Sequence, residues 1–256
     1  MPKEAIFLVL GLQLATMLLA TGHMILIRTL VNRREARLFL MEMTATFQLC
    51  TCNGFLLLLM DIHPQNQLII TYIYVLTTVH YILTLNENIS NPACTFLYIL
   101  RKGISVRLGS LKIVAQFVGA AIARLYFNGI YSLGISYQFS EPKCNPHQAD
   151  FFKAFCIELV TSTMFQLAML TSEQQQLSFR ANRLAFVITS VVYTGGHVTG
   201  AIFNPALAFS LHMSCFLDAF WNYMLVYWVA PCLGSALVVV LWDEVLPLLR
   251  RQHLLG

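Results

Sequence analysis

The sequence predicts an all-α polytopic membrane protein built from two inverted repeats, each interrupted by a helix of half length. The 256 residues are 57% hydrophobic and only 11% charged, with a mean hydropathy of +0.67, whereas charged residues make up about a quarter of an ordinary soluble domain. Seven apolar runs are long enough to cross a bilayer, and two more are about half that length. A tripeptide motif, a glutamate and a glycine of the first half of the chain recur in the second half at a nearly constant interval.

The first apolar run, 5–27, lies outside this repeat. Only Lys3 and Glu4 carry charge before it, and its 23 residues exceed the roughly 7–15 residues of a signal-peptide core. We therefore expect residues 1–30 to form an additional N-terminal transmembrane helix. The other full-length runs are 38–60, 68–85, 108–128, 151–170, 184–200 and 219–241.

The two short runs, 91–100 and 204–214, open with the same tripeptide, Asn-Pro-Ala. Asn caps the free backbone donors of a helix start, and Pro suits the first helical position. About eleven residues span roughly 16 Å, half of a roughly 30 Å hydrocarbon core. The glycine-rich stretch 195–200 suggests an irregular entry loop before the second short helix. Such backbone is tolerated in a membrane only where it lines a cavity or is buried in protein, so we predict two re-entrant segments.

Three pairs of landmarks define the repeat. The Asn-Pro-Ala motifs begin 113 residues apart, Glu42 and Glu158 lie 116 apart, and Gly119 and Gly234 lie 115 apart. Each half holds three full spans, so the second half must run through the membrane in the opposite sense, as in many transport proteins. The predicted units are a first repeat at 38–134, a second repeat at 150–246 and a cytoplasmic tail at 247–256.

The basic residues indicate membrane topology rather than a nucleic-acid partner. The net charge is +4, but twelve of the sixteen Lys and Arg residues cluster between apolar runs on one predicted side, which identifies that side as cytoplasmic. Residue 1 is then luminal, opposite the C-terminus. The clusters are Arg28 to Arg37, Arg101 to Lys112, Arg180 with Arg183, and Arg250 with Arg251.

Neither a metal nor a cofactor is expected. Six of the seven cysteines lie in or beside apolar runs, and no Cys-x-x-Cys spacing occurs. His80, His197 and His212 are scattered and have no Cys or carboxylate at ligand spacing. We expect no enzyme activity.

The paired motifs Asn91-Pro92-Ala93 and Asn204-Pro205-Ala206 resemble those of the aquaporin family, over about residues 38–246. The resemblance implies that the two half-helices meet end to end inside a pore. Asn91 and Asn204 would then present amide donors to water, while the helix ends disfavour cations. The alternative is that each Asn merely caps its helix.

Glu42 and Glu158 are ionisable residues inside apolar spans, which are costly and by default functional. They could relay protons in a coupled transporter. Alternatively, as in aquaporins, they accept hydrogen bonds from the backbone of the re-entrant loops, and their symmetric placement favours this supporting role.

Family spacing places four residues at the outer constriction: Thr71, Val192, Ala201 and Leu207. Water-selective aquaporins usually carry Arg where this chain has Leu207. Cys215, nine residues after Ala206, is similar to the cysteine of the unorthodox superaquaporin branch, although the first motif here is intact and is followed by Cys94.

The resemblance implies a passive channel for water and small uncharged solutes, glycerol and hydrogen peroxide among them. It also implies a homotetramer in an intracellular membrane, the endoplasmic reticulum, with the plasma membrane as the alternative location. The alternatives are a proton-coupled secondary transporter that uses Glu42 or Glu158 and a non-conducting membrane scaffold.

Overall fold

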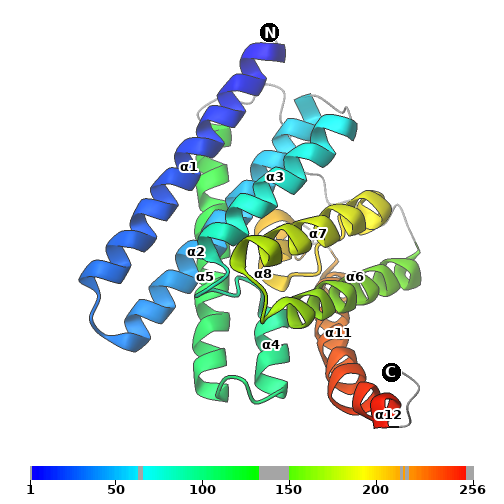
Figure 1. Ribbon diagram of the computed structural model, residues 1–256. Helices are drawn as coiled ribbons and strands as arrows, with labels where there is room; N and C mark the ends of the chain where they lie inside the picture. Colours follow the sequence, from blue (N-terminus) through cyan, green and yellow to red (C-terminus); the bar gives the residue numbers. More distant parts are fainter. Residues whose placement is uncertain (1, 63–65, 133–149, 214–215, 217–218, 252–256) are drawn as a thin grey trace.

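The computed structural model describes residues 2–62, 66–132, 150–213, 216 and 219–251. Its regular structure in these ranges is entirely helical, and Figure 1 shows the helices gathered into one bundle. The helices of the first half are α1 (Pro2–Leu30), α2 (Arg34–Ile62), α3 (Asn66–Thr84), α4 (Pro92–Leu100) and α5 (Val106–Ser132). Those of the second half are α6 (Phe151–Ser172), α7 (Leu177–Thr199), α8 (Pro205–Leu211), α10 (Phe220–Met224), α11 (Ala230–Val239) and α12 (Leu246–Arg251).

A helix occupies each of the seven predicted spans. Six helical stretches are long and apolar enough to cross a membrane. The seventh, α7, has 23 residues but is less apolar, since it carries Arg180 and Arg183 near its start. The last span is longer than the predicted 219–241, because π-helical turns at Leu225–Val229 and Val240–Val245 join α10, α11 and α12 without a break. The predicted tail at 247–256 therefore begins inside a helix.

The second re-entrant segment is shorter than predicted. Gly195 and Gly196, expected in a loop, belong to the last turns of α7, which ends at Thr199. Gly200 then adopts a left-handed conformation with φ of 85°, which a residue without a side chain reaches at little cost. The half-helix α8 ends at Leu211 instead of residue 214.

Equivalent helices of the two halves pack in equivalent ways. α2 packs against α5, and α6 packs against α11. A Cβ atom on Gly119 would lie 2.3 Å from the carbonyl oxygen of Met43, and one on Gly234 would lie 3.1 Å from that of Leu159. Both glycines thus allow a helix backbone to approach its neighbour closely, and the two contacts are related by the interval of the sequence repeat.

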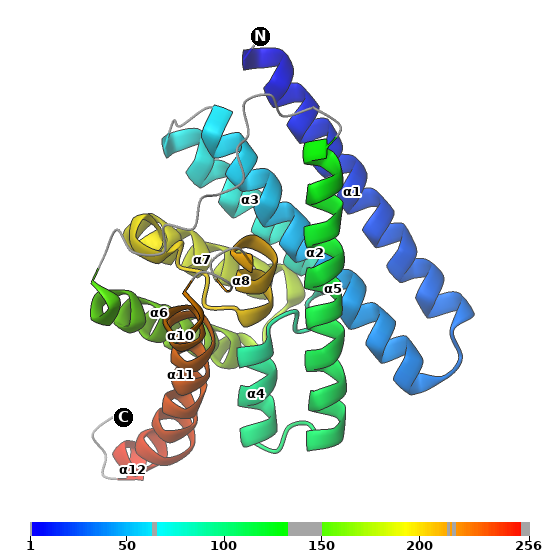
Figure 2. The same cartoon turned by 180° about the vertical axis from the view of Figure 1, so that it is seen from behind.

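The two halves are also interlocked. α4, from the first half, packs on α11 of the second, and α8 packs on α5. The Ser235 hydroxyl on α11 donates a 2.8 Å hydrogen bond to the carbonyl of Ala93 at the start of α4. Figures 1 and 2 show α8 in the middle of the bundle and α4 between α5 and α11, with the loops that lead into the two half-helices close together. This exchange places the two Asn-Pro-Ala motifs side by side.

The additional helix α1 lies along one edge of the bundle and packs against α2 (Figures 1 and 2). Polar contacts fix it there: the Gln48 amide donates to the Met17 carbonyl at 3.2 Å, and the Thr16 and Tyr126 hydroxyls lie 2.8 Å apart. The N-terminus and α12 lie at opposite ends of the molecule.

Candidate functional site

Asn91 and Asn204 each cap a half-helix and also reach across to the other repeat. The Asn91 Oδ1 accepts a 2.9 Å hydrogen bond from the Ala93 N–H, and the Asn204 Oδ1 accepts a 3.0 Å bond from the Ala206 N–H. The Asn91 amide donates to the Phe203 carbonyl at 3.1 Å, and the Asn204 amide donates to the Ser90 carbonyl at 2.9 Å. A side-chain amide has two N–H donors, so each Asn retains one for a ligand.

The residue before each Asn has an unusual backbone conformation. Ser90 and Phe203 have φ values of 55° and 37°, in the left-handed region that costs a non-glycine residue of order 1–3 kcal/mol and persists only when the surroundings impose it. The same geometry at equivalent positions turns each chain abruptly into its half-helix. Hydrogen bonds to a buried carboxylate hold both turns.

Those carboxylates belong to Glu42 and Glu158, both with 0% exposure. Glu42 accepts hydrogen bonds from the backbone N–H groups of Ile89 (3.0 Å) and Ser90 (2.6 Å). Glu158 accepts from those of Ile202 (3.0 Å) and Phe203 (2.6 Å). These are the contacts that a loop-supporting role requires.

Lys112 and Gln116 complete the first of these sites, and neither was predicted from the sequence as a partner of Glu42. The Lys112 ammonium lies 2.5 Å from the second oxygen of Glu42 and 3.3 Å from the Glu87 carbonyl. Gln116 donates to Glu42 at 2.8 Å and to the Thr95 hydroxyl at 2.9 Å. Lys112 was expected to belong to a cytoplasmic charge cluster. Its position inside the apolar run 108–128 was the available signal, since an intramembrane cation needs a partner.

The second site lacks such a cation. Tyr227 and Pro231 lie one 115-residue interval after Lys112 and Gln116, and the Tyr227 hydroxyl donates to the Thr199 carbonyl at 2.9 Å. Within the described ranges, no ion pair involves Glu158. Both carboxylates therefore hold their loops through backbone hydrogen bonds, but of the two only Glu42 is paired with a buried cation in the described ranges.

A cavity of about 420 Å³ extends from the two motifs toward the ends of α7 and α8. α2, α3, α7, α8 and the second re-entrant loop enclose it. Asn91 and Asn204 lie on its wall, whereas Glu42 and Glu158 do not. Most of the wall is apolar; its polar side chains also include Asn53, Thr77, His80, Thr189, Tyr193, His197 and His212.

Three of the four predicted constriction residues line this cavity: Val192, Ala201 and Leu207. The fourth, Thr71, does not, and this assignment is corrected. Its side chain is exposed, and its hydroxyl bonds to the Gln67 carbonyl one turn earlier in α3. Ile70 and Ile73 line the cavity from α3 instead, because the rotation of that helix turns residue 71 away from the interior.

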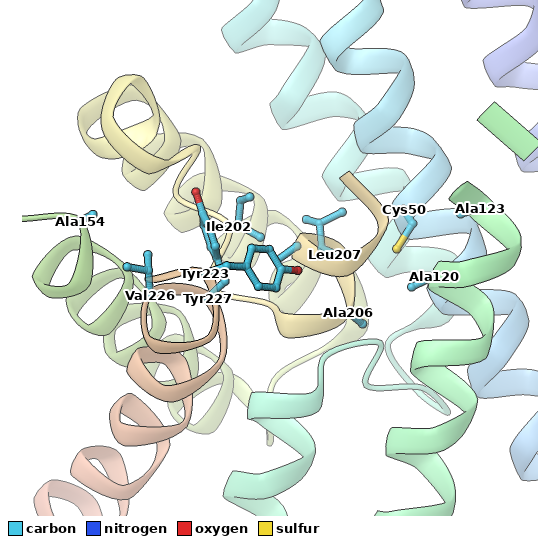
Figure 3. Packing of buried hydrophobic residues seen from close by; sticks show 11 residues of the cluster. Cys50, Ala120, Ala123, Ala154, Ile202, Ala206, Leu207, Tyr223, Val226 and Tyr227 are labelled. Carbon is cyan, nitrogen blue, oxygen red and sulfur yellow. The ribbon is translucent and has the colours of Figure 1, made fainter. Parts of the chain in front are cut away.

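The first half of α8 is packed tightly on its other sides. Ala206 is fully buried, and Figure 3 shows it near Ala120 on α5, while Tyr223 and Tyr227 approach from the last span. Leu207 is 8% exposed. Cys94 is buried directly after the first motif, and the predicted subfamily residue Cys215 lies outside the described ranges.

Comparison with known proteins agrees with this geometry. The model of a family described as major intrinsic protein matches residues 61–242. The chain belongs to the major intrinsic protein family. Members of this family, the aquaporins, are membrane channels rather than enzymes.

The relatives include members of the predicted superaquaporin branch, which confirms that assignment. Human aquaporin-11 is 39% identical over 249 residues, which cover 95% of this chain and 92% of the relative. Mouse aquaporin-12 is 28% identical over 193 residues, 73% of this chain and 66% of the relative. The structure of the aquaglyceroporin from Plasmodium falciparum superimposes with a TM-score of 0.71, covering 84% of this chain and 99% of that chain at 17% identity, which confirms the predicted fold.

Proposed function

We propose that the protein is a passive channel for water and small uncharged solutes, glycerol and hydrogen peroxide among them. The observation that carries this proposal is the position of Asn91 and Asn204 on the wall of one cavity, each with an N–H donor to spare. Such donors can replace part of the hydration of an uncharged solute.

The wall of the outer cavity supports the inclusion of glycerol. Leu207, Val192 and Ala201 are apolar and occupy positions where family spacing places the constriction. An apolar wall offers few hydrogen bonds to water, but it contacts the hydrocarbon surface of glycerol favourably. Glycerol should therefore pass better, relative to water, than in a channel with Arg after the second motif.

A proton-coupled carrier is less well supported. Neither Glu42 nor Glu158 reaches the cavity. Both oxygens of Glu158 accept from loop N–H groups, whereas one oxygen of Glu42 accepts from the loop and the other pairs with Lys112. We further propose that the channel resides in the endoplasmic reticulum membrane as a homotetramer, which its similarity to the superaquaporin branch supports.

Reconstitution into proteoliposomes tests the proposal. A channel gives solute flux that is linear in concentration and unaffected by a pH gradient, whereas a coupled carrier saturates and accumulates its substrate. Saturation together with pH-driven accumulation would refute the passive mechanism. Chemical crosslinking that stops at the monomer would count against the tetramer.

A further inference from the structure

The cavity ends shortly past the motif pair, on the side toward the end of α4. Its inner wall includes Tyr81 on α3 and Phe165 on α6, next to Phe203 in the second re-entrant loop. From there a packed apolar cluster continues to Leu85 and Leu184. A conducting pathway must cross this cluster to reach the side of the molecule on which α4 ends.

Three aromatic side chains form the front of the cluster. The ring centroids of Tyr81 and Phe165 are 6.4 Å apart, and those of Phe165 and Phe203 are 5.1 Å apart. These are ordinary packing distances between aromatic rings. The three rings come from three separate elements and meet between α3, α6 and the re-entrant loop.

Their exposure shows that water has little access to them. Tyr81, Phe165 and Phe203 are 7%, 2% and 6% exposed, and Leu184 behind them is 0% exposed. The wall of the cavity reaches the three rings but includes neither Leu85 nor Leu184, which pack behind them. The outer half of the route is thus open as a cavity of about 420 Å³, whereas the inner half is filled by side chains.

We propose that Tyr81, Phe165 and Phe203 form an apolar plug that closes the pathway inside the motif pair and determines which solutes pass. Hydrophobic constrictions exclude water until they widen. Widening requires a rotamer change of at least one of these rings, and Phe165 is in contact with both of the others. The inference rests on the proposed channel function and places a second barrier, the plug, in series with the outer wall at Val192, Ala201 and Leu207.

The test measures water and glycerol permeability of proteoliposomes, normalised to folded protein, for the wild type, Phe165→Ala and Phe165→Leu. Removal of a constriction that gates by dewetting should raise water permeability by on the order of tenfold for Phe165→Ala, with a smaller rise for Phe165→Leu. The glycerol-to-water ratio should also rise, since glycerol is the larger solute. Phe165→Leu keeps most of the apolar volume, so it remains informative if Phe165→Ala does not fold.

Phe55→Ala is the matched control. Phe55 is 0% exposed on α2 and packs against Phe127 and Tyr126, away from the cavity. Phe55→Ala removes the same side-chain atoms as Phe165→Ala and should cost a similar amount of stability. The permeability of this control per folded protein should nevertheless equal that of the wild type. Equal increases in permeability in Phe165→Ala and Phe55→Ala would overturn the proposal of a plug.

Two further outcomes separate this inference from the channel proposal. If the wild type conducts and neither Phe165 variant changes the flux, the plug is refuted and the channel function stands. If the wild type and both variants are folded but pass neither water nor glycerol, both proposals are refuted.

Discussion

Replacing each loop-supporting glutamate by glutamine, one at a time, should destabilise the protein by unequal amounts. The substitution is chemically the same at both positions, and both carboxylates accept two backbone N–H groups. The difference lies in Lys112, which pairs with Glu42 at 2.5 Å. In the described ranges, Glu158 has no cation in that role.

The hydrogen-bond and charge partners of each glutamate determine how much stability its replacement should cost. In Glu158→Gln the side-chain NH₂ group cannot accept a hydrogen bond, so one loop N–H loses its acceptor. This loss costs about 1–3 kcal/mol of stability. In Glu42→Gln the side chain still accepts from Ile89 and Ser90, but it leaves the Lys112 ammonium, only 8% exposed, without a counter-charge. Loss of one partner of a buried pair costs about 3–5 kcal/mol. The expected gap of roughly 2 kcal/mol corresponds to about 4–8 °C in Tm for a chain of this size.

Thermal unfolding of the purified variants in detergent, followed by circular dichroism, measures this gap. The double variant Glu42→Gln with Lys112→Met removes the stranded cation and should recover most of the additional loss. Equal Tm values for the two single variants, or a double variant no more stable than Glu42→Gln alone, would show that the unpaired Lys112 ammonium does not cause the additional loss of stability.

Three other substitutions test separate parts of the structure. Asn204→Leu should abolish flux and lower stability by about 2–4 kcal/mol, because it removes the helix cap and leaves the Ser90 carbonyl without its donor; retained flux in a folded variant would leave Asn204 with a structural role alone. Leu207→Arg should lower the glycerol-to-water permeability ratio without an ion leak, and an unchanged ratio would remove Leu207 from the constriction. Gly119→Ala should lower Tm more than Gly234→Ala, because the added Cβ would lie 2.3 Å rather than 3.1 Å from a carbonyl oxygen; the reverse order in a melting experiment would contradict this.

Short-range signals explain which parts of the fold could be predicted from the sequence. Caps and fixed intervals placed the starts of α4 and α8 at the observed residues, since a cap acts within a few positions of its helix. Glu42 and Glu158 could be paired with the loops because the repeat related them. The predicted span 184–200 ends within one residue of α7, but the entry loop predicted over 195–200 was wrong, because packing keeps Gly195 and Gly196 helical.

Longer-range features could not be predicted in the same way. The partner of Glu42 lies on another helix, and no spacing along the chain connects it to Lys112. Thr71 was placed in the constriction by counting residues, but the rotation of α3 about its axis is set by packing. The contact of Phe165 with Tyr81 and Phe203 depends on the arrangement of three elements, which composition does not encode.

The interlocked half-helices impose an order on biosynthesis. α4 packs on α11, and its Ala93 carbonyl bonds to Ser235, which is 142 residues further along the chain. At roughly 5–20 residues per second, that segment takes about 7–30 s to synthesise. During this interval the first re-entrant loop has only its own repeat to hold it. α8 has no such delay, because its support, α5, precedes it in the chain. A truncated first half, made alone, would therefore keep the contact of α4 with α5 but lack its contact with α11.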